Sequence, residues 1–129
     1  MSEFPDGLQY SEEHEYLMST NESGVYQVGI TDYAQGELGD IVYVELPTVG
    51  ENFEKKATFG TIEAVKAVSD LYCPVDGEIV AVNASLDDDP SVINSDPYGA
   101  GWIVRLRVGD QGAVDALMDA TAYEALVGE

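Results

Sequence analysis

The stretch Gly60-Thr-Ile-Glu-Ala-Val-Lys-Ala-Val-Ser-Asp-Leu-Tyr-Cys-Pro74 decides the fold. Apolar and β-branched residues lie on both sides of its centre, and such residues favour strands. Glycine and proline mark its two ends, as they do at turns. The stretch therefore predicts a β-hairpin with Lys66 at or near its tip. Because the whole chain has only three lysines, a lysine in this apolar setting needs a physical reason.

Further strands are predicted on both sides of this hairpin, over residues 14–19, 25–30, 41–46, 77–82 and 102–108. Residues 39–44 and 77–82 share a pattern of glycine, acid, Ile-Val, a variable position and Val. The two copies bracket the hairpin, so they predict two similar halves packed as two sheets, with the hairpin projecting from one of them. Alternation over 102–108 predicts that Trp102 faces the core and Ile103 the opposite face.

Short helices complete the pattern. Thr31 is a good N-cap residue and predicts one or two helical turns that stop at Gly36. Pro90 predicts a short helix over 91–94, after an acidic turn at 87–90. Apolar residues at near-helical spacing over 113–127 predict one or two amphipathic helices. The sequence thus predicts a mainly β fold with short helices and a helical C-terminus, as a single domain over residues 1–129.

The charge excludes two classes of partner. The chain has 25 acidic and 5 basic residues, for a net charge of −20. Nucleic acids and anionic membrane surfaces both require basic patches, so neither is an expected partner. There is no run of about 18 apolar residues and no signal-peptide pattern, which predicts a cytoplasmic protein. The dispersed acids resemble those of proteins from salt-loving organisms and predict that salt stabilises the fold by screening repulsion.

Cys73 and His14 are the only residues of their kinds. A single cysteine cannot form an internal disulfide or a Cys-based metal cluster, and a lone imidazole cannot build a metal site. We interpret Cys73 as a half-buried packing residue and His14 as a structural strand residue. Asp87 to Asp89 lack a full calcium-loop pattern and are read as a solvated turn. No nucleophile elbow is present, which makes an enzyme the weakest interpretation.

Lys66 allows two interpretations. An exposed lysine keeps a high pKa, so it is a poor nucleophile or base and is better suited to covalent modification by another enzyme. Alternatively, Lys66 stays unmodified and protects a strand edge from aggregation, as in a structural or adaptor module. The residues alone leave both interpretations open.

A resemblance extends over nearly the whole chain. Glu63-Ala-Val-Lys-Ala67, followed by Ser69-Asp70, Pro74 and Gly77-Glu78, resembles the lipoylation site of the glycine cleavage system H protein family. Other blocks resemble that family in the same order: Leu8, Tyr10, His14-Glu-Tyr16, residues 28–35 and 38–47, Asn83, Pro90, Asn94, Pro97-Tyr98 and Gly101-Trp102. Ordered blocks across about a hundred residues are far more specific than one motif.

The resemblance implies a barrel-sandwich hybrid of two antiparallel sheets, as in lipoyl and biotinyl domains, with Lys66 carrying lipoic acid as an amide. It implies a carrier without catalytic residues, because the cofactor supplies the chemistry. The lipoyl arm would accept an aminomethyl group from glycine decarboxylase and deliver it to the tetrahydrofolate-dependent aminomethyltransferase. Dihydrolipoyl dehydrogenase would then reoxidise the arm, and a lipoate ligase or lipoyl transferase would attach it.

Three acids match the family around Lys66. Glu15 and Asp70 are candidates for holding the cationic amine of the loaded arm. Glu63 and Asp70 flank the lysine and are candidates for recognition by the ligase. The alternative is that Glu15 and Asp70 are ordinary surface acids. The sequence departs from the family at Ala64, where serine is usual, at Tyr16, where tryptophan is common, and at Glu37, where some members have histidine.

Two rival carriers remain at this stage. One is a lipoyl or biotinyl domain of another multienzyme complex, although such domains are shorter and lack the 38–47 block. The other is a related protein that relays lipoate to other enzymes.

Overall fold

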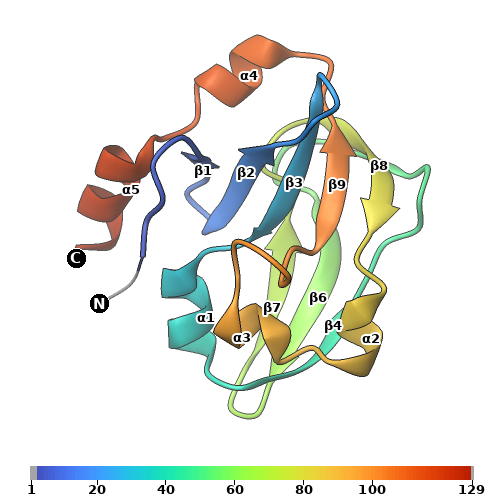
Figure 1. The fold of residues 1–129 in the computed structure, drawn as a ribbon, viewed down its shortest axis with the longest axis vertical. Helices are drawn as coiled ribbons and strands as arrows, with labels where there is room; N and C mark the ends of the chain where they lie inside the picture. The colour runs from blue at the N-terminus through green and yellow to red at the C-terminus, as the bar shows by residue number, and fades with distance from the viewer. Residues whose placement is uncertain (1–2, 129) are drawn as a thin grey trace.

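A computed structural model describes residues 3–128 as two antiparallel sheets joined by short helices (Figure 1). The larger sheet has the strand order β1 (Gln9–Tyr10), β2 (Glu15–Ser19), β3 (Val25–Ile30), β9 (Val104–Arg107), β8 (Gly77–Val82) and β5 (Asn52–Phe53). The smaller sheet has the order β4 (Ile41–Glu45), β6 (Thr58–Ala64) and β7 (Val68–Tyr72). The predicted fold class is confirmed.

The helices are short and lie at the ends and edges of the sheets. They are α1 (Asp32–Leu38), α2 (Ser85–Asp88), α3 (Val92–Ser95), α4 (Gln111–Asp115) and α5 (Ala120–Val127). Figure 1 shows α1, α2 and α3 at the lower end of the molecule, beside the β6–β7 hairpin. The last two helices confirm the predicted helical C-terminus, and Figure 1 places α5 beside β1.

The main core fills the space between the two sheets. β3 contributes Val28, β6 contributes Ile62, β7 contributes Leu71 and β9 contributes Leu106, and each of these side chains is almost completely buried. Burying one such aliphatic side chain stabilises the fold by about 1.5–3 kcal/mol. Because Ile62 and Leu71 belong to the hairpin strands, the core fixes the base of the hairpin while its tip extends beyond.

A second, aromatic cluster joins both ends of the chain. The rings of Tyr10 and Tyr123 are stacked with their centres 4.8 Å apart, and Phe4 meets Tyr123 edge-on at 5.6 Å. Leu8, Tyr16 and Ala120 complete the buried part of this cluster. It attaches α5 to the edge of the larger sheet at β1 and β2.

The central hairpin and the repeated pattern appear as predicted. β6 and β7 pair in antiparallel register from Thr58↔Tyr72 to Glu63↔Val68. The two copies of the repeated pattern form β4 and β8, which lie in different sheets. The hairpin projects from the smaller sheet, as expected.

The predicted end of α1 at Gly36 is wrong. The cap at Thr31 is confirmed, since its hydroxyl accepts a hydrogen bond from the amide of Ala34 at 3.2 Å. The helix continues through Gly36, which is exposed and has no neighbour that its missing side chain would meet. It ends at Gly39, whose φ of 82° is accessible to glycine but strained for other residues.

The predicted alternation of residues 102–108 holds only from Val104 onward. β9 begins at Val104, and Ile103 is fully buried, whereas Trp102 is only half-buried. The guanidinium carbon of Arg105 lies 4.5 Å from the centre of the indole ring, which is a cation–π contact. The prediction that Trp102 faces the core is therefore wrong, because the chain is not yet a regular strand at residues 102 and 103.

Three smaller predictions also need correction. The expected acidic turn at 87–90 begins inside a helix, since Asp87 and Asp88 belong to α2. Cys73 is 1% exposed rather than half-buried. His14 lies just before β2 with a φ of 73°, so it is a turn residue and not a strand residue.

Candidate functional site

Lys66 lies in the turn that joins β6 to β7. The turn closes through two backbone hydrogen bonds, from the amide of Ala64 to the carbonyl of Ala67 at 2.7 Å and from the amide of Ala67 to the carbonyl of Ala64 at 3.4 Å. Lys66 is exposed, as the sequence predicted. Both ion pairs found among residues 3–128 involve Arg107, so the ammonium group of Lys66 is not held in one of them.

The turn is attached to the junction between α1 and β4. The amide of Val65 donates to the carbonyl of Asp40 at 3.0 Å. The side chain of Lys66 passes over Gly39, where a Cβ atom would lie 3.0 Å from Cε of the lysine. The absence of a side chain at residue 39 thus allows this close approach, and the backbone of Asp40 fixes the position of the tip.

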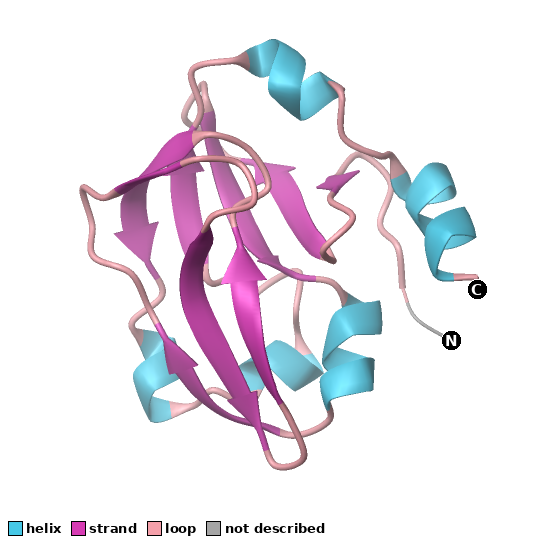
Figure 2. Cartoon of the chain, turned by 180° about the vertical axis from the view of Figure 1, so that it is seen from behind, coloured by secondary structure: helices cyan, strands magenta, loops and turns pink. Residues whose placement is uncertain are grey.

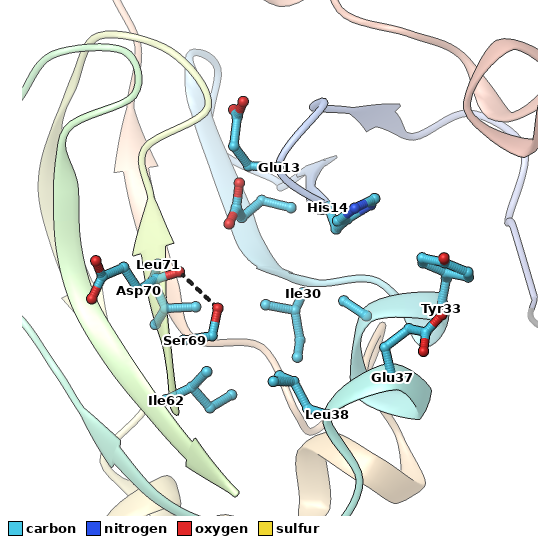
Figure 3. Close-up of a pocket in the computed structure, with 12 residues that line it drawn as sticks. Glu13, His14, Ile30, Tyr33, Glu37, Leu38, Ile62, Ser69, Asp70 and Leu71 are labelled. Carbon is cyan, nitrogen blue, oxygen red and sulfur yellow. Dashed lines mark hydrogen bonds between the residues drawn. The ribbon is translucent and has the colours of Figure 1, made fainter. Parts of the chain in front are cut away.

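A cavity of about 270 Å³ lies beside the hairpin, between β7, α1 and the turn before β2 (Figure 3). Figure 3 shows Ile30, Leu38 and Ile62 extending into this space from three different elements. Leu71 and Ser69 line it from β7. The interior of the cavity is therefore largely apolar, and its wall includes the strand that follows Lys66.

Polar groups surround this apolar interior. Glu13 and His14 line the cavity from the turn before β2, and Tyr33 and Glu37 line it from α1 (Figure 3). Burial lowers the pKa of His14, an effect that Glu13 and Glu37 oppose through their charges. The imidazole is thus mostly neutral near pH 7, while carboxylates give this side of the cavity a negative potential.

Glu15 is the one acid at the cavity that is buried, with 2% of its surface exposed. Its carboxyl accepts hydrogen bonds from the hydroxyl of Ser11 at 2.9 Å and from the amide of Tyr72 at 3.3 Å. Burial raises the pKa of Glu15 to about 8, although these hydrogen bonds oppose the shift. The alternative that Glu15 is an ordinary surface acid is therefore wrong, and the cavity contains a carboxyl group that a cation would ionise.

Asp70 and Glu63 point elsewhere. Asp70 contributes to the cavity wall, but Figure 3 shows its carboxylate on the side of β7 away from Ile30. Its neighbours Ser69 and Leu71 turn inward, as alternation along a strand requires. Glu63 is exposed and does not line the cavity. The structure thus brings only Glu15 of the three predicted acids into the cavity and leaves Asp70 and Glu63 on the outer face of the small sheet.

His14 is a cavity residue that sequence reasoning missed. Its Nδ1 lies 2.7 Å from the hydroxyl of Tyr123, which also lies 2.8 Å from Oγ1 of Thr31. The positive φ of His14 cannot be read from a strand-like pattern, so no local signal pointed to this position at the cavity. Glu37 carried a weak signal, because it occupies a position where the family varies, and it does line the cavity.

Other kinds of site are not found among residues 3–128. No group of three or more histidine, cysteine or acidic side chains is placed to hold a metal ion in this part of the chain. No helix in the described part has the length and apolar character needed to cross a membrane.

Comparisons with known proteins agree with this geometry. The sequence model of the glycine cleavage H-protein family matches residues 8–129. A glycine cleavage system H protein of Klebsiella pneumoniae is 53% identical over 127 residues, which cover 98% of each chain. One from Bacteroides thetaiotaomicron is 50% identical over 124 residues, covering 96% of this chain and 97% of that protein. The crystal structure of such a protein from Mycobacterium marinum superposes with a TM-score of 0.87 at 38% identity, over 98% of this chain and 100% of that one.

A β-sandwich that presents one lysine on a hairpin tip, beside a cavity, has the form of a carrier protein. The chain belongs to the glycine cleavage H-protein family. It is the carrier component of that system and not an enzyme, as the sequence predicted. The match over residues 8–129 also rules against a lipoyl or biotinyl domain of another complex.

Proposed function

We propose that Lys66 carries lipoic acid in amide linkage and that the chain shuttles an aminomethyl group between the enzymes of glycine cleavage. Glycine decarboxylase would load the arm, the tetrahydrofolate-dependent aminomethyltransferase would unload it, and dihydrolipoyl dehydrogenase would reoxidise it. When bound, the lipoyl group supplies a disulfide whose sulfur accepts the aminomethyl fragment. The observation that carries this proposal is Lys66, exposed at a hairpin tip whose second strand forms a wall of the cavity.

The residues present fit a lipoyl group. The amine of Lys66 is accessible to an attaching enzyme, and the backbone of Asp40 holds the turn in place. The apolar interior of the cavity, formed by Ile30, Leu38 and Ile62, suits a hydrocarbon chain and its sulfur ring. The cavity of about 270 Å³ lies just below the range of roughly 300–1,000 Å³ that is usual for drug-sized ligands, so it suits a small group such as the end of the arm.

Glu15 is the residue that we assign to the amine of the loaded arm. A cationic amine near Glu15 would ionise the buried carboxyl and form a charge-assisted hydrogen bond with it. Ser11 and the amide of Tyr72 hold the carboxyl in place through their hydrogen bonds. Such a contact would exclude water from the labile aminomethyl group and slow its loss. We assign Asp70 and Glu63 to recognition of the chain by the attaching enzyme, since both face outward.

Intact mass spectrometry tests the attachment site. The chain, incubated with a lipoate ligase, lipoate and Mg-ATP, is expected to gain the mass of one lipoyl amide. Lys66→Arg is expected to abolish this gain, whereas Lys55→Arg and Lys56→Arg keep it and serve as matched controls. No mass gain in the wild type, or a gain that persists in Lys66→Arg, would overturn the assignment.

The rate at which the loaded arm is hydrolysed tests the role of Glu15. Glu15→Gln is expected to accelerate loss of the aminomethyl group, because the amide cannot supply a negative charge. Asp70→Asn is a matched control and should change the rate little, since its carboxylate points away from the cavity. Equal rates in the wild type and Glu15→Gln would refute the role in holding the arm.

A further assay distinguishes a carrier of glycine cleavage from a protein that relays lipoate. It measures the exchange of carbon dioxide with the carboxyl carbon of glycine, which a glycine decarboxylase catalyses. A lipoylated chain that supports this exchange is a carrier of glycine cleavage. A lipoylated chain that does not support it, but transfers lipoate to other proteins, would be a relay. The single buried cysteine is compatible with a reducing, cytoplasmic setting for either function.

A further inference from the structure

Large apolar side chains that are at least half exposed gather around Lys66. Among residues 3–128 there are six such side chains, and four of them lie at the end of the small sheet that carries the lysine: Val42, Tyr43, Val65 and Val68. Val65 is 76% exposed and Val68 is 66% exposed. The other two, Val49 and Leu126, lie elsewhere in the fold. We call the group of four the apolar collar.

The strand register explains why these side chains share one surface. Tyr43 pairs with Glu63, and Glu63 pairs with Val68, so the three side chains form one row across β4, β6 and β7. The register shifts between Ile41 and Tyr43, which leaves Val42 exposed beside Tyr43. Val65 belongs to the turn itself. Figure 2 shows the face of the small sheet toward the viewer, with no helix across it.

Acids surround the collar. Glu63 lies in the middle of the row, and Glu45 and Asp70 flank Thr61 in the next row of the same face. A second copy of this chain would bring another net charge of −20 against these acids, which opposes self-association through this surface. The surface instead suits a partner with an apolar recess and cationic groups at its border.

We propose that the apolar collar, together with Glu63, is the docking surface for the enzyme that acylates Lys66. This inference rests on the proposed function. Acylation requires Nζ of Lys66 itself to enter the active centre of the partner, so that partner must contact the residues immediately around the lysine. The three enzymes of the shuttle react with the far end of the arm and can work at a distance from the tip.

The acylation step defines what the partner has to accommodate. The ammonium group of Lys66 first loses a proton to a base of the partner. Its nitrogen then attacks the acyl carbon of an activated lipoyl group, a mixed anhydride with adenylate. The new amide C–N bond forms as the C–O bond between the acyl carbon and the phosphate breaks, AMP leaves with the electron pair, and the nitrogen releases its second proton to water. A partner that buries the collar also desolvates this amine, which favours the neutral form that attacks.

Steady-state lipoylation of collar variants tests the proposal. The variants Val65→Thr, Val68→Thr and Tyr43→Thr each replace an apolar group by a polar β-branched side chain that suits a strand or an extended turn. Each is expected to lower kcat/KM for the ligase about ten-fold or more, mainly through KM, as loss of a central contact does. The matched controls Val49→Thr and Leu126→Thr remove equally exposed apolar groups elsewhere and should stay within about two-fold of the wild type.

A second measurement separates docking of the ligase from other defects. Variants that are lipoylated to completion with excess ligase should be reduced by dihydrolipoyl dehydrogenase at rates within about two-fold of the wild type. Unchanged kcat/KM for lipoylation, or equal losses in collar and control variants, would overturn the proposal. Sedimentation that reveals a dimer of the wild type, lost in collar variants, would instead assign the surface to a second copy. A wild type that is never lipoylated refutes the proposed function itself.

Discussion

The hydroxyl of Tyr123 lies 2.7 Å from Nδ1 of His14, across 109 residues of sequence. The same hydroxyl lies 2.8 Å from Oγ1 of the fully buried Thr31, which caps α1. The C-terminal helix thus supports two of the elements that frame the cavity, although α5 itself contributes no cavity residue.

Tyr123→Phe is expected to lower the free energy of unfolding by about 1–3 kcal/mol, because it leaves the buried hydroxyl of Thr31 without this partner. Tyr26→Phe is the matched control. The hydroxyl of Tyr26 donates to the exposed Gln111 at 2.7 Å, so its loss should cost less. Urea unfolding measures both. A larger loss in Tyr26→Phe than in Tyr123→Phe would contradict this account.

Glu15 makes stability depend on pH. Its pKa is raised by burial from 4.5 to about 8, so the folded chain keeps a proton that the unfolded chain releases. The contribution of Glu15 to folding therefore falls as the pH rises from about 4.5 to about 8. Glu15→Gln removes this dependence. As the pH rises from 5 to 9, the free energy of unfolding of Glu15→Gln, measured in urea, should increase relative to that of the wild type.

Glu63→Gln is the control for that experiment, since Glu63 is exposed. Its difference from the wild type should change little over the same pH range. If the free energy of unfolding of Glu15→Gln stays constant or falls relative to that of the wild type as the pH rises, Glu15 is ionised in the folded chain.

Substitution of glycine by alanine is expected to have opposite effects on stability at residues 39 and 36. Gly39→Ala places a Cβ atom at a φ of 82° and within 3.0 Å of the Lys66 side chain, so it should destabilise the fold by about 1 kcal/mol or more. Gly36→Ala lies within α1 with free space around it and should stabilise by about 0.5–1 kcal/mol. Thermal unfolding of both variants checks the signs, and a stabilising Gly39→Ala would contradict the structure.

Cys73 should be inert in the folded chain. Its thiol is 1% exposed and donates to the carbonyl of Val75 at 3.0 Å, and burial raises its pKa to about 12. Ellman's reagent is expected to react with one thiol per chain in denaturant and far more slowly without it. Rapid reaction of the native protein would show that the region around residue 73 opens readily.

Potassium chloride should raise the melting temperature. The net charge of −20 is compensated by few ion pairs, since those found among residues 3–128 both involve Arg107. Screening of the remaining repulsion therefore stabilises the compact state. A melting temperature that is flat or falls between low and molar salt would refute this prediction.

Local patterns predicted most of the strands and the position of Lys66. The β6–β7 hairpin was clear because β-branched residues, a glycine and a proline all indicate the same structure, and the core then fixes it. Two-residue strands such as β1 and β5 were missed, since two residues carry no periodicity. The stop predicted at Gly36 failed because packing and a favourable C-cap at Gly39 outweigh the low helix propensity of one glycine.

The cavity could not be predicted from local patterns. Its lining combines β2, α1 and β7, which meet only in the folded chain. Family resemblance selected Glu15 as a candidate, and Glu15 does line the cavity, but burial, which sets its protonation, is a property of the packed structure. The outward direction of Asp70 follows from alternation along β7, so the sequence contained that signal once the register was known.

The position of β7 directly after the turn of Lys66 limits how the chain length near the lysine can change. The strand runs directly from the turn of Lys66 into the cavity wall at Ser69 and Leu71. A strand advances about 3.3 Å per residue and turns successive side chains to opposite faces. One residue inserted between Lys66 and Ser69 would therefore lengthen the chain between these two residues by about 3.3 Å. It would also exchange the inward-facing and outward-facing side chains of β7. The number of residues between Lys66 and Ser69 therefore sets both where the lysine stands relative to the cavity wall and which side chains of β7 face the cavity.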